Sequence, residues 1–538
     1  MADTQVLVVG AGPVGLTLAV DLGKRGIRCT LIEQKEAPAF LPKMERCNAR
    51  TMELYRRMGI SERVRAAGLP RNNPMDVFIV LSLVEPPLWR LPFASVAVAE
   101  QEIAASTDAS HPLEPYQLIS QYTLEPLLKS IAEELPSVAV RYGHELTAFT
   151  DNGHSVTGHI RRLDGTTIDI TADYLVGCDG GGSGVRKQLD IKLAGDANLQ
   201  QFRQALYRID DLYERIPIGK GRHYHVADAH SSFLITQDST RHFTLHSILD
   251  SDAEMDAMLE RVIAMPVKYE RLSCAPWRQN LLVADSYQRG RVFLAGDAVH
   301  LVIPTGGLGM NTGVGDAIDL GWKLAATLRG WGGPNLLGSY EIERRQVGER
   351  NVAASRFAAT GRRKWRAMYR PNIGDDTPEG AKTRADLIAV ADVEQRKSNE
   401  MIGAELGYRY AGSPLIADEP GDGPPHEFMT YVPSTSPGAR LPHVWLKDRT
   451  AVQDRIGYGD HYTLLRLDGT TDAAGFDTAF AAIGAPFRLL ALDEPHAREI
   501  YGCDLMLLRP DMHIAWRGDA APGASGAAKL AQMATGNF

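Results

Sequence analysis

The residues best suited to chemistry in this chain are three glycines whose spacing is typical of a phosphate-binding turn. Gly10, Gly12 and Gly15 follow the apolar run TQVLVV in a G-x-G-x-x-G pattern, and a helical sequence comes next. This pattern makes a tight turn, lets backbone approach a pyrophosphate and points a helix N-terminus at the anion. Glu33 ends the following apolar run, where a carboxylate can accept hydrogen bonds from a ribose. The segment therefore predicts a dinucleotide site, for either FAD or NAD.

Two further turns, rich in glycine and aspartate, also follow apolar runs. TADYLVGCDGGGSGVRKQL contains a D-G-x-x-S-x-x-R pattern that extends from Asp179 to Arg186. RVFLAGDAVHLVIPTGGLGMN contains Gly296 and Asp297, and a helical pattern follows it. The two turns lie more than a hundred residues apart, so only a fold that joins their strands can bring them to one site.

The three motifs resemble those of the single-component FAD-dependent aromatic hydroxylases, the group that contains p-hydroxybenzoate hydroxylase and phenol hydroxylase. In that family the glycine fingerprint holds the ADP part of FAD, the D-G segment serves FAD and NADPH, and the G-D aspartate contacts the ribityl side. Weaker similarities in MERCNARTMELYRRMGI, ISQYTLEPLL and PTGGLGMN imply contacts to the flavin ring. The cofactor-binding residues implied by the resemblance are Gly10, Gly12, Gly15, Glu33, Gln34, Arg46, Gln121, Asp179, Arg186, Gly296, Asp297, Pro304, Gly307, Gly309, Met310 and Asn311.

The resemblance also implies a reaction, the hydroxylation of a phenolic or related aromatic ring. NAD(P)H would reduce FAD, the reduced flavin would form a C4a-hydroperoxide with O₂, and the ring would take one oxygen atom from it. The protein must then hold the ring, accept or relay the phenol proton and exclude water. The candidate catalytic residues are Glu45, Tyr224, His225 and Pro304. The alternatives are a solvated loop carboxylate for Glu45 and a structural histidine for His225.

Other functions stay open at this stage. Epoxidation, Baeyer-Villiger oxygenation or ring opening of an aromatic or polyketide substrate would need the same cofactor and a different pocket. A flavin-containing protein that only sequesters an aromatic compound should show a damaged D-G or G-D motif, and both motifs are whole. The sequence has neither a clustered nucleophile and base nor a spacing such as H-E-x-x-H, so we expect no metal site.

The elements around these motifs predict an α/β fold. A Rossmann-type FAD-binding domain should be interleaved with a mostly antiparallel β-sheet substrate domain, because the intervening segments alternate polar and apolar residues. The segments HYTLLRLDG, APFRLLALD and RPDMHIAWR resemble the thioredoxin-like domain of phenol hydroxylase, without the C-x-x-C pair that disulfide exchange requires. We expect residues 1–75, 115–195 and 285–400 in the FAD-binding domain with its long C-terminal helices, 75–115 and 195–285 in the substrate domain, and 400–538 in a linker and the thioredoxin-like domain.

Composition and charge narrow the class of protein further. The chain has 538 residues, 44% of them hydrophobic, which is enough for several globular domains. A formal net charge of −8 without a basic run argues against nucleic acid as a partner. Five scattered cysteines suit a reducing compartment, and no apolar run is long enough to span a bilayer. We therefore expect a cytoplasmic protein. The resemblance further implies FAD, a small aromatic substrate and O₂ as partners, with NADPH or NADH as the transient reductant, and we expect a homodimer.

Overall fold

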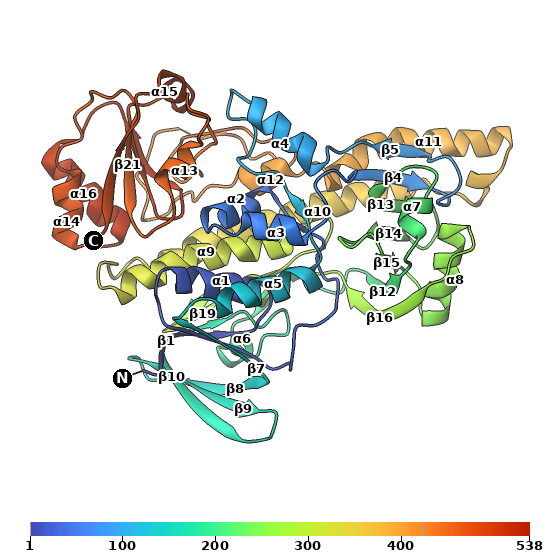
Figure 1. Cartoon of the computed structure of the whole chain (residues 1–538), viewed down its shortest axis with the longest axis horizontal. Coiled ribbons are helices and arrows are strands. Elements are labelled where there is room, and N and C mark those ends of the chain that lie inside the picture. The colour runs from blue at the N-terminus through green and yellow to red at the C-terminus, as the bar shows by residue number, and fades with distance from the viewer. Residues whose placement is uncertain (1, 422) are drawn as a thin grey trace.

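The computed structural model describes residues 2–421 and 423–538, and a parallel sheet lies at the centre of its FAD-binding part (Figure 1). The parallel neighbours in this sheet follow the order β19 (Val292–Leu294), β10 (Thr167–Gly177), β1 (Thr4–Val9), β2 (Cys29–Glu33) and β7 (Val138–Tyr142). Their apolar runs are typical of strands with both faces covered. The helices α1 (Pro13–Lys24), α5 (Gln121–Glu133) and α9 (Gly309–Leu328) pack together over one face (Figure 1).

The strand order explains how the three motifs meet. Each motif follows the carboxyl end of a strand, and these strands, β1, β10 and β19, are direct neighbours. Val9 is paired with Gly177, and Gly177 with Leu294, so the three chains leave the sheet at the same level. Parallel strands present their carboxyl ends at one edge, which is where ligands bind in open α/β sheets.

The second part is a seven-stranded sheet whose strands come from two separate stretches of the chain. Its order is β16 (Glu270–Arg278), β12 (Gln201–Arg208), β15 (His242–Ser247), β14 (Phe233–Thr236), β13 (Gly221–Val226), β4 (Asp76–Val80) and β5 (Trp89–Leu91). All pairs are antiparallel except β13 with β4. One face packs against α8 (Asp252–Ile263) in an apolar core, which leaves the other face free to line a cavity.

Long helices connect the sheet to the rest of the molecule. α10 (Ser339–Arg366) contacts α9 at one end and α11 (Pro378–Glu394) at the other, and it extends beside the seven-stranded sheet (Figure 1). After residue 400 the chain stays with the FAD-binding part for a short helix, α12 (Ile402–Leu406), which packs on α2 (Ala49–Arg57).

The third part contains four strands in the order β22 (Phe487–Ala491), β21 (Tyr462–Arg466), β23 (Leu505–Leu508) and β24 (Ile514–Gly518). β21 and β22 are parallel and the other pairs are antiparallel, as in a thioredoxin-like sheet. The helices α14 (Phe476–Ile483) and α16 (Gly523–Thr535) pack against each other beside this sheet (Figure 1). The predicted fold class is confirmed by this architecture.

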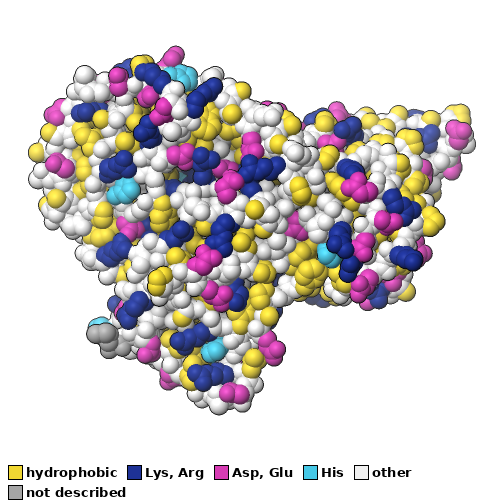
Figure 2. All heavy atoms as spheres, viewed as in Figure 1, with side chains coloured by type: hydrophobic (Ala, Val, Ile, Leu, Met, Phe, Trp, Pro, Cys, Tyr) yellow, Lys and Arg dark blue, Asp and Glu magenta, His cyan; other side chains and the backbone are white. Residues whose placement is uncertain are grey.

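The surface gives two further observations. Figure 2 shows acidic and basic side chains interspersed over the face in view, without a large area of one sign. Within the described part of the chain, no helix has both the length and the apolar character that crossing a bilayer would require.

Candidate active site

A cavity of about 1150 Å³ lies between the carboxyl edge of the parallel sheet and the free face of the seven-stranded sheet. The remaining walls are formed by the segment 34–46 that follows β2, by the start of α9 and by one side of α10. Small-molecule pockets usually measure roughly 300–1000 Å³. This cavity therefore has room for a dinucleotide and a second molecule beside it.

The glycine fingerprint forms one end of the cavity. Gly12 is the N-cap of α1 and has no side chain to cap the first turn, and a Cβ atom at Gly12 would have open space around it. Gly10 has a φ of +105°, and a Cβ there would lie 2.4 Å from the carbonyl oxygen of Cys178. The first amide groups of α1 are thus free to bind an anion, in the way that helix N-termini bind pyrophosphate.

Glu33 is fixed beside this helix start by two backbone amides. Its Oε2 accepts a hydrogen bond from the amide of Ala11 at 3.0 Å, and its Oε1 accepts one from Lys35 at 3.0 Å. Each oxygen keeps a lone pair for a further donor. The carboxylate is therefore oriented to accept hydrogen bonds from a ribose, as the sequence predicts.

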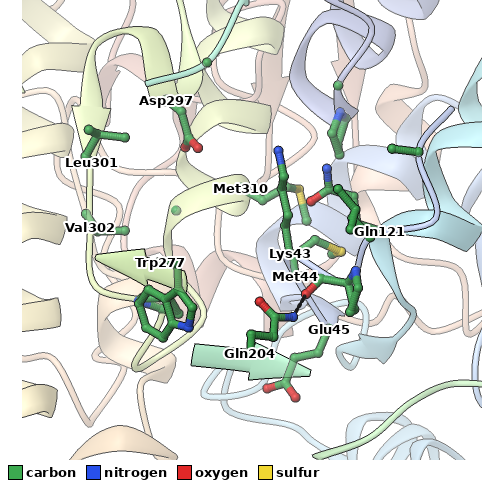
Figure 3. A pocket seen from close by; sticks show the side chains of 18 of the residues that line it. Lys43, Met44, Glu45, Gln121, Gln204, Trp277, Asp297, Leu301, Val302 and Met310 are labelled. Carbon is green, nitrogen blue, oxygen red and sulfur yellow. Dashed lines mark hydrogen bonds between the residues drawn. The ribbon is translucent and has the colours of Figure 1, made fainter. Parts of the chain in front are cut away.

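The G-D turn presents Asp297 to the cavity from the opposite wall (Figure 3). The turn is held from behind by Asp316, whose Oδ2 accepts from the Gly296 amide at 3.0 Å and from His300 Nε2 at 2.8 Å. Burial raises the pKa of Asp297, and the neighbouring His300 and Lys43 oppose that shift. Asp297 is the polar group on this wall that could accept from the hydroxyls of a ribityl chain.

The loop before α9 forms the middle of the cavity. Gly307, Gly309 and Met310 line it, and α9 begins at Gly309, so its first amide groups also lie at the wall. The Asn311 amide is already occupied, because it accepts from the Asn48 backbone at 2.9 Å and donates to the Gly307 carbonyl at 2.7 Å. Asn311 therefore anchors the loop with its side chain.

Arg46 and Gln121 approach the same loop from the other side. Arg46 is buried and donates to the Gly306 carbonyl at 2.7 Å and to Glu405 at 3.1 Å. Gln121 donates to Glu125 at 2.6 Å and lines the cavity (Figure 3). Gln34, Asp179 and Pro304 also lie on the wall, so most of the predicted cofactor residues share one cavity.

Three predicted cofactor residues lie behind the wall. Gly15 packs against the Gly10 carbonyl, which a Cβ at Gly15 would approach to 2.0 Å. Gly296 has a φ of +65° and forms the turn itself. Arg186 was expected to contact the cofactor, but its guanidinium donates to the carbonyls of Ala298 at 2.9 Å and Gly181 at 3.1 Å. Arg186 therefore ties the D-G loop to the G-D loop.

The seven-stranded sheet gives the other half of the cavity an aromatic wall of two cross-strand ring pairs. Phe202 and Trp277 are stacked with centroids 5.2 Å apart, and Phe233 and His246 are stacked at 4.6 Å. All four side chains line the cavity. The two pairs meet edge to face, with His246 and Trp277 at 89°, and together they offer a large apolar surface against which an aromatic ligand can be buried.

A carboxylate and an imidazole meet beside this wall. His223 Nε2 lies 2.7 Å from Glu45 Oε2, and both residues line the cavity. Burial alone would raise the pKa of Glu45, but the neighbouring His223, Arg222 and Arg46 lower it to about 2. Burial, together with Arg222 and Arg362, lowers the pKa of His223 despite the opposing effect of Glu45. The pair is thus an ionised carboxylate that accepts the Nε2 hydrogen of a neutral imidazole.

The predictions for Tyr224 and His225 are wrong for this cavity. Tyr224 lies on the opposite face of β13, stacked on Phe78, and its hydroxyl donates to the Gly219 carbonyl at 3.0 Å. His225 is fully buried beneath Trp365, with Nε2 at 3.2 Å from the Gln395 amide nitrogen. Side chains alternate between the two faces of a strand, so Tyr224 points away from the cavity. His225 lies on the same face as His223, but α10 and its neighbours cover it.

Sequence reasoning missed four polar residues on the substrate side. Gln204, Arg222, His223 and Arg362 line this side of the cavity, and no motif gave any of them a role toward the substrate. The alternating pattern HYHV marks a strand but not which of its histidines stays uncovered. Arg362 lies in a helix with dense charge, which is typical of a solvated face.

Comparisons with known proteins agree with this geometry. Residues 3–355 match the family described as FAD binding domain, and residues 434–538 match the one described as aromatic-ring hydroxylase, C-terminal. The FAD-dependent monooxygenase apdD of Emericella nidulans is 31% identical over 571 residues, which cover 99% of this chain and 90% of apdD. Aklavinone 12-hydroxylase RdmE of Streptomyces purpurascens is 31% identical and is aligned over 96% of both chains. A solved structure of the rebeccamycin biosynthetic enzyme RebC with reduced flavin has a TM-score of 0.90 and 32% identity, over 99% of both chains.

Proposed function

The chain belongs to the family of FAD-dependent aromatic-ring hydroxylases, and from this premise we propose that it hydroxylates a phenol fused to further rings, such as an aromatic polyketide. One observation carries the proposal: the aromatic pairs Phe202–Trp277 and Phe233–His246 line the same cavity as the Glu45–His223 pair. A multi-ring aromatic substrate would be buried against these four rings and bring its hydroxyl group to the carboxylate.

The class of reaction predicted from the sequence is confirmed. The enzyme is an FAD-dependent monooxygenase that consumes NAD(P)H. Bound FAD, once reduced, supplies the activation of oxygen from which one atom reaches the aromatic ring. The protein's own groups bind the cofactor, orient the substrate ring, accept the proton of its hydroxyl group and exclude water.

The residues on the cavity wall fit FAD in a definite order. The uncapped start of α1 at Gly12 would hold the pyrophosphate, and Glu33 the adenosine ribose. Asp297 would accept from the ribityl hydroxyls, and the loop at Gly307 with the start of α9 would border the flavin ring. This order follows the edge of the parallel sheet and leaves the aromatic wall to the substrate.

Glu45 and His223 are the groups suited to take the phenol proton. Among the described residues Glu45 Oε1 has no hydrogen-bond partner, so it can accept the hydrogen of a substrate hydroxyl while Oε2 stays bound to His223. A hydroxyl that donates to a carboxylate makes its ring richer in electrons, which favours attack on an electrophilic oxygen. A positioned acid or base of this kind is worth about 10²- to 10⁴-fold in rate.

A cytoplasmic homodimer with O₂ as second substrate completes the proposal. Four of the five cysteines are buried and all are free, which suits a reducing compartment. The thioredoxin-like part has no cysteine pair for exchange chemistry, so its role as a packing or dimer surface is the simpler one. Light scattering of the purified FAD-bound protein measures the number of chains directly.

The decisive experiment uses the FAD-loaded protein with NADPH or NADH, ¹⁸O₂ and phenols of one to four fused rings. We expect a multi-ring phenol to stimulate NAD(P)H oxidation and to gain one ¹⁸O atom. Glu45→Gln should lower this coupled hydroxylation about 100-fold without loss of flavin. Stimulation only by single-ring phenols, or an unchanged rate in Glu45→Gln, would contradict the proposal.

A further inference from the structure

Two arginines on the substrate side of the cavity form no ion pair within the described part of the chain. Arg222, on β13, is 2% exposed, and among the described residues its Nε and Nη1 have no hydrogen-bond acceptor. Its Nη2 reaches the Asn399 amide oxygen at 3.0 Å when that amide takes the orientation that satisfies its neighbours. Arg362, on α10, has no acceptor within the described part of the chain, and its Nε is buried. Both guanidinium groups line the cavity.

The carboxylates near these arginines do not balance their charge. Glu45 is bonded through Oε2 to His223, and Glu405 is bonded to Arg46 at 3.1 Å and to the Ala49 amide at 3.3 Å. The three guanidinium groups of Arg46, Arg222 and Arg362 therefore share these two carboxylates. Burial lowers the pKa of Arg222, and Arg46 adds to that shift. A guanidinium nevertheless stays charged in proteins. The substrate side therefore holds a surplus of positive charge.

A buried cation without hydrogen-bond partners destabilises the folded protein, so such a group indicates a site where a bound ligand supplies the missing acceptors. Aromatic rings hold both guanidinium groups in place. Arg222 lies 5.0 Å from the ring centroid of Phe93 and 5.7 Å from that of Tyr116, and Arg362 lies 5.2 Å from that of Phe233. The planar fork of a guanidinium matches a carboxylate through two parallel hydrogen bonds.

We propose that Arg222 and Arg362 bind a carboxylate of the substrate, which is therefore an aromatic acid as well as a phenol. This inference rests on the proposed function and adds a requirement for a charged group. The ring system would lie against the aromatic side chains of the seven-stranded sheet, with the carboxylate toward the two arginines and the phenol toward Glu45. The binding step needs no further chemistry, since the acid is ionised at neutral pH.

The test compares acids with their esters on the FAD-loaded full chain. Salicylate, 3-hydroxy-2-naphthoate and 1-hydroxyanthraquinone-2-carboxylate are each titrated beside the methyl ester, and Kd is obtained from the change in flavin absorbance. We expect at least one acid to bind about tenfold or more tightly than its ester, the range of a charged hydrogen-bonded pair. Arg222→Met and Arg362→Met should each weaken the acid and leave the ester unchanged, and Arg222→Lys should keep part of the preference.

A matched control lies on the same helix as Arg362. Arg356 pairs with Asp196 at the surface at 2.6 Å, and Arg356→Met should leave the preference for the acid intact. Arg222→Met should not lower the melting temperature of the ligand-free protein, because the loss of its one hydrogen bond, to Asn399, is offset by the removal of a desolvated cation. A fall of several degrees would show a structural role and overturn the inference.

Several results would overturn the carboxylate site. These are equal Kd values for every acid and its ester, no binding by any acid, a loss that affects acid and ester alike, or a loss of bound flavin in Arg222→Met. The two proposals can fail separately. Hydroxylation of a neutral phenol without any preference for acids would support the proposed function and contradict the carboxylate site. Tight binding of acids without hydroxylation would support the carboxylate site and contradict the proposed function.

Discussion

Arg509 joins the C-terminal part of the molecule to the FAD-binding part through a fully buried ionic cluster. Its guanidinium donates to Glu343 at 2.5 and 3.0 Å, to Asp319 at 3.0 Å and to Asp511 at 2.6 Å. Lys323 donates to Asp319 at 2.7 Å and to Glu343 at 2.6 Å. None of these side chains is more than 3% exposed. Arg509→Met therefore leaves three buried carboxylates facing one ammonium group.

The size of the effect follows from the burial and charge of these groups. Removing one partner from a buried ion pair costs about 3–5 kcal/mol. The protein can escape part of that cost by protonating a carboxyl, which at pH 7 costs about 1.4 kcal/mol for each pH unit above its ordinary pKa. In the native protein, Arg509 and Lys323 offset the effect of burial and lower the pKa of Glu343 to about 2. Without Arg509, that pKa should rise above its value in the unfolded chain.

The sign of the pH dependence follows from this shift. Between the unfolded and the raised folded pKa, the folded variant binds more protons than the unfolded chain, so its stability increases as the pH falls. We expect Arg509→Met to lose about 3–5 kcal/mol at pH 7.5 and clearly less at pH 5.5. Urea unfolding followed by tryptophan fluorescence at both pH values measures the difference.

Arg517→Met is the control for this prediction. Arg517 pairs with Glu419 in the same part of the molecule, but their side chains are 27% and 36% exposed. An exposed pair of this kind is worth up to about 1 kcal/mol. The reasoning is refuted if Arg509→Met costs no more than Arg517→Met, or if its cost does not shrink at the lower pH.

Three further predictions concern single positions. Gly12→Val should fold but lose FAD, seen as a fall in absorbance at 450 nm, because its side chain would project into the cavity beside the start of α1. Tyr224→Phe should leave coupled hydroxylation unchanged and cost about 1 kcal/mol of stability, because among the described residues its hydroxyl bonds only to backbone at Gly219 and Gly221. Burial lowers the pKa of His443 to about 4, so the unfolded chain binds a proton that the folded chain rejects. Stability should therefore fall as the pH drops from about 6.5 to 4, by up to about 3 kcal/mol, and thermal melts of His443→Phe should show a smaller fall.

The cofactor half of the site was largely predictable from the sequence because its signals are local. A glycine that must adopt a φ of +105°, as Gly10 does, or a helix that must begin without a capping side chain, is visible within a few residues. Each motif also follows its strand directly, and parallel strands of one sheet end at a common edge. The convergence of Gly12, Asp179 and Asp297 therefore follows from strand order alone.

The substrate half depends on contacts between residues far apart in the sequence, so only the tertiary structure decided it. Glu45 and His223 are separated by 178 positions, and no pattern at either one specifies the other. His223 faces the cavity, whereas His225, on the same face of the same strand, is covered by Trp365 of α10. Strand alternation determines the face of a residue, but a helix packed later determines which part of that face stays open. The sequence by itself therefore determined the cofactor and the class of reaction, and packing decided which side chains meet the substrate.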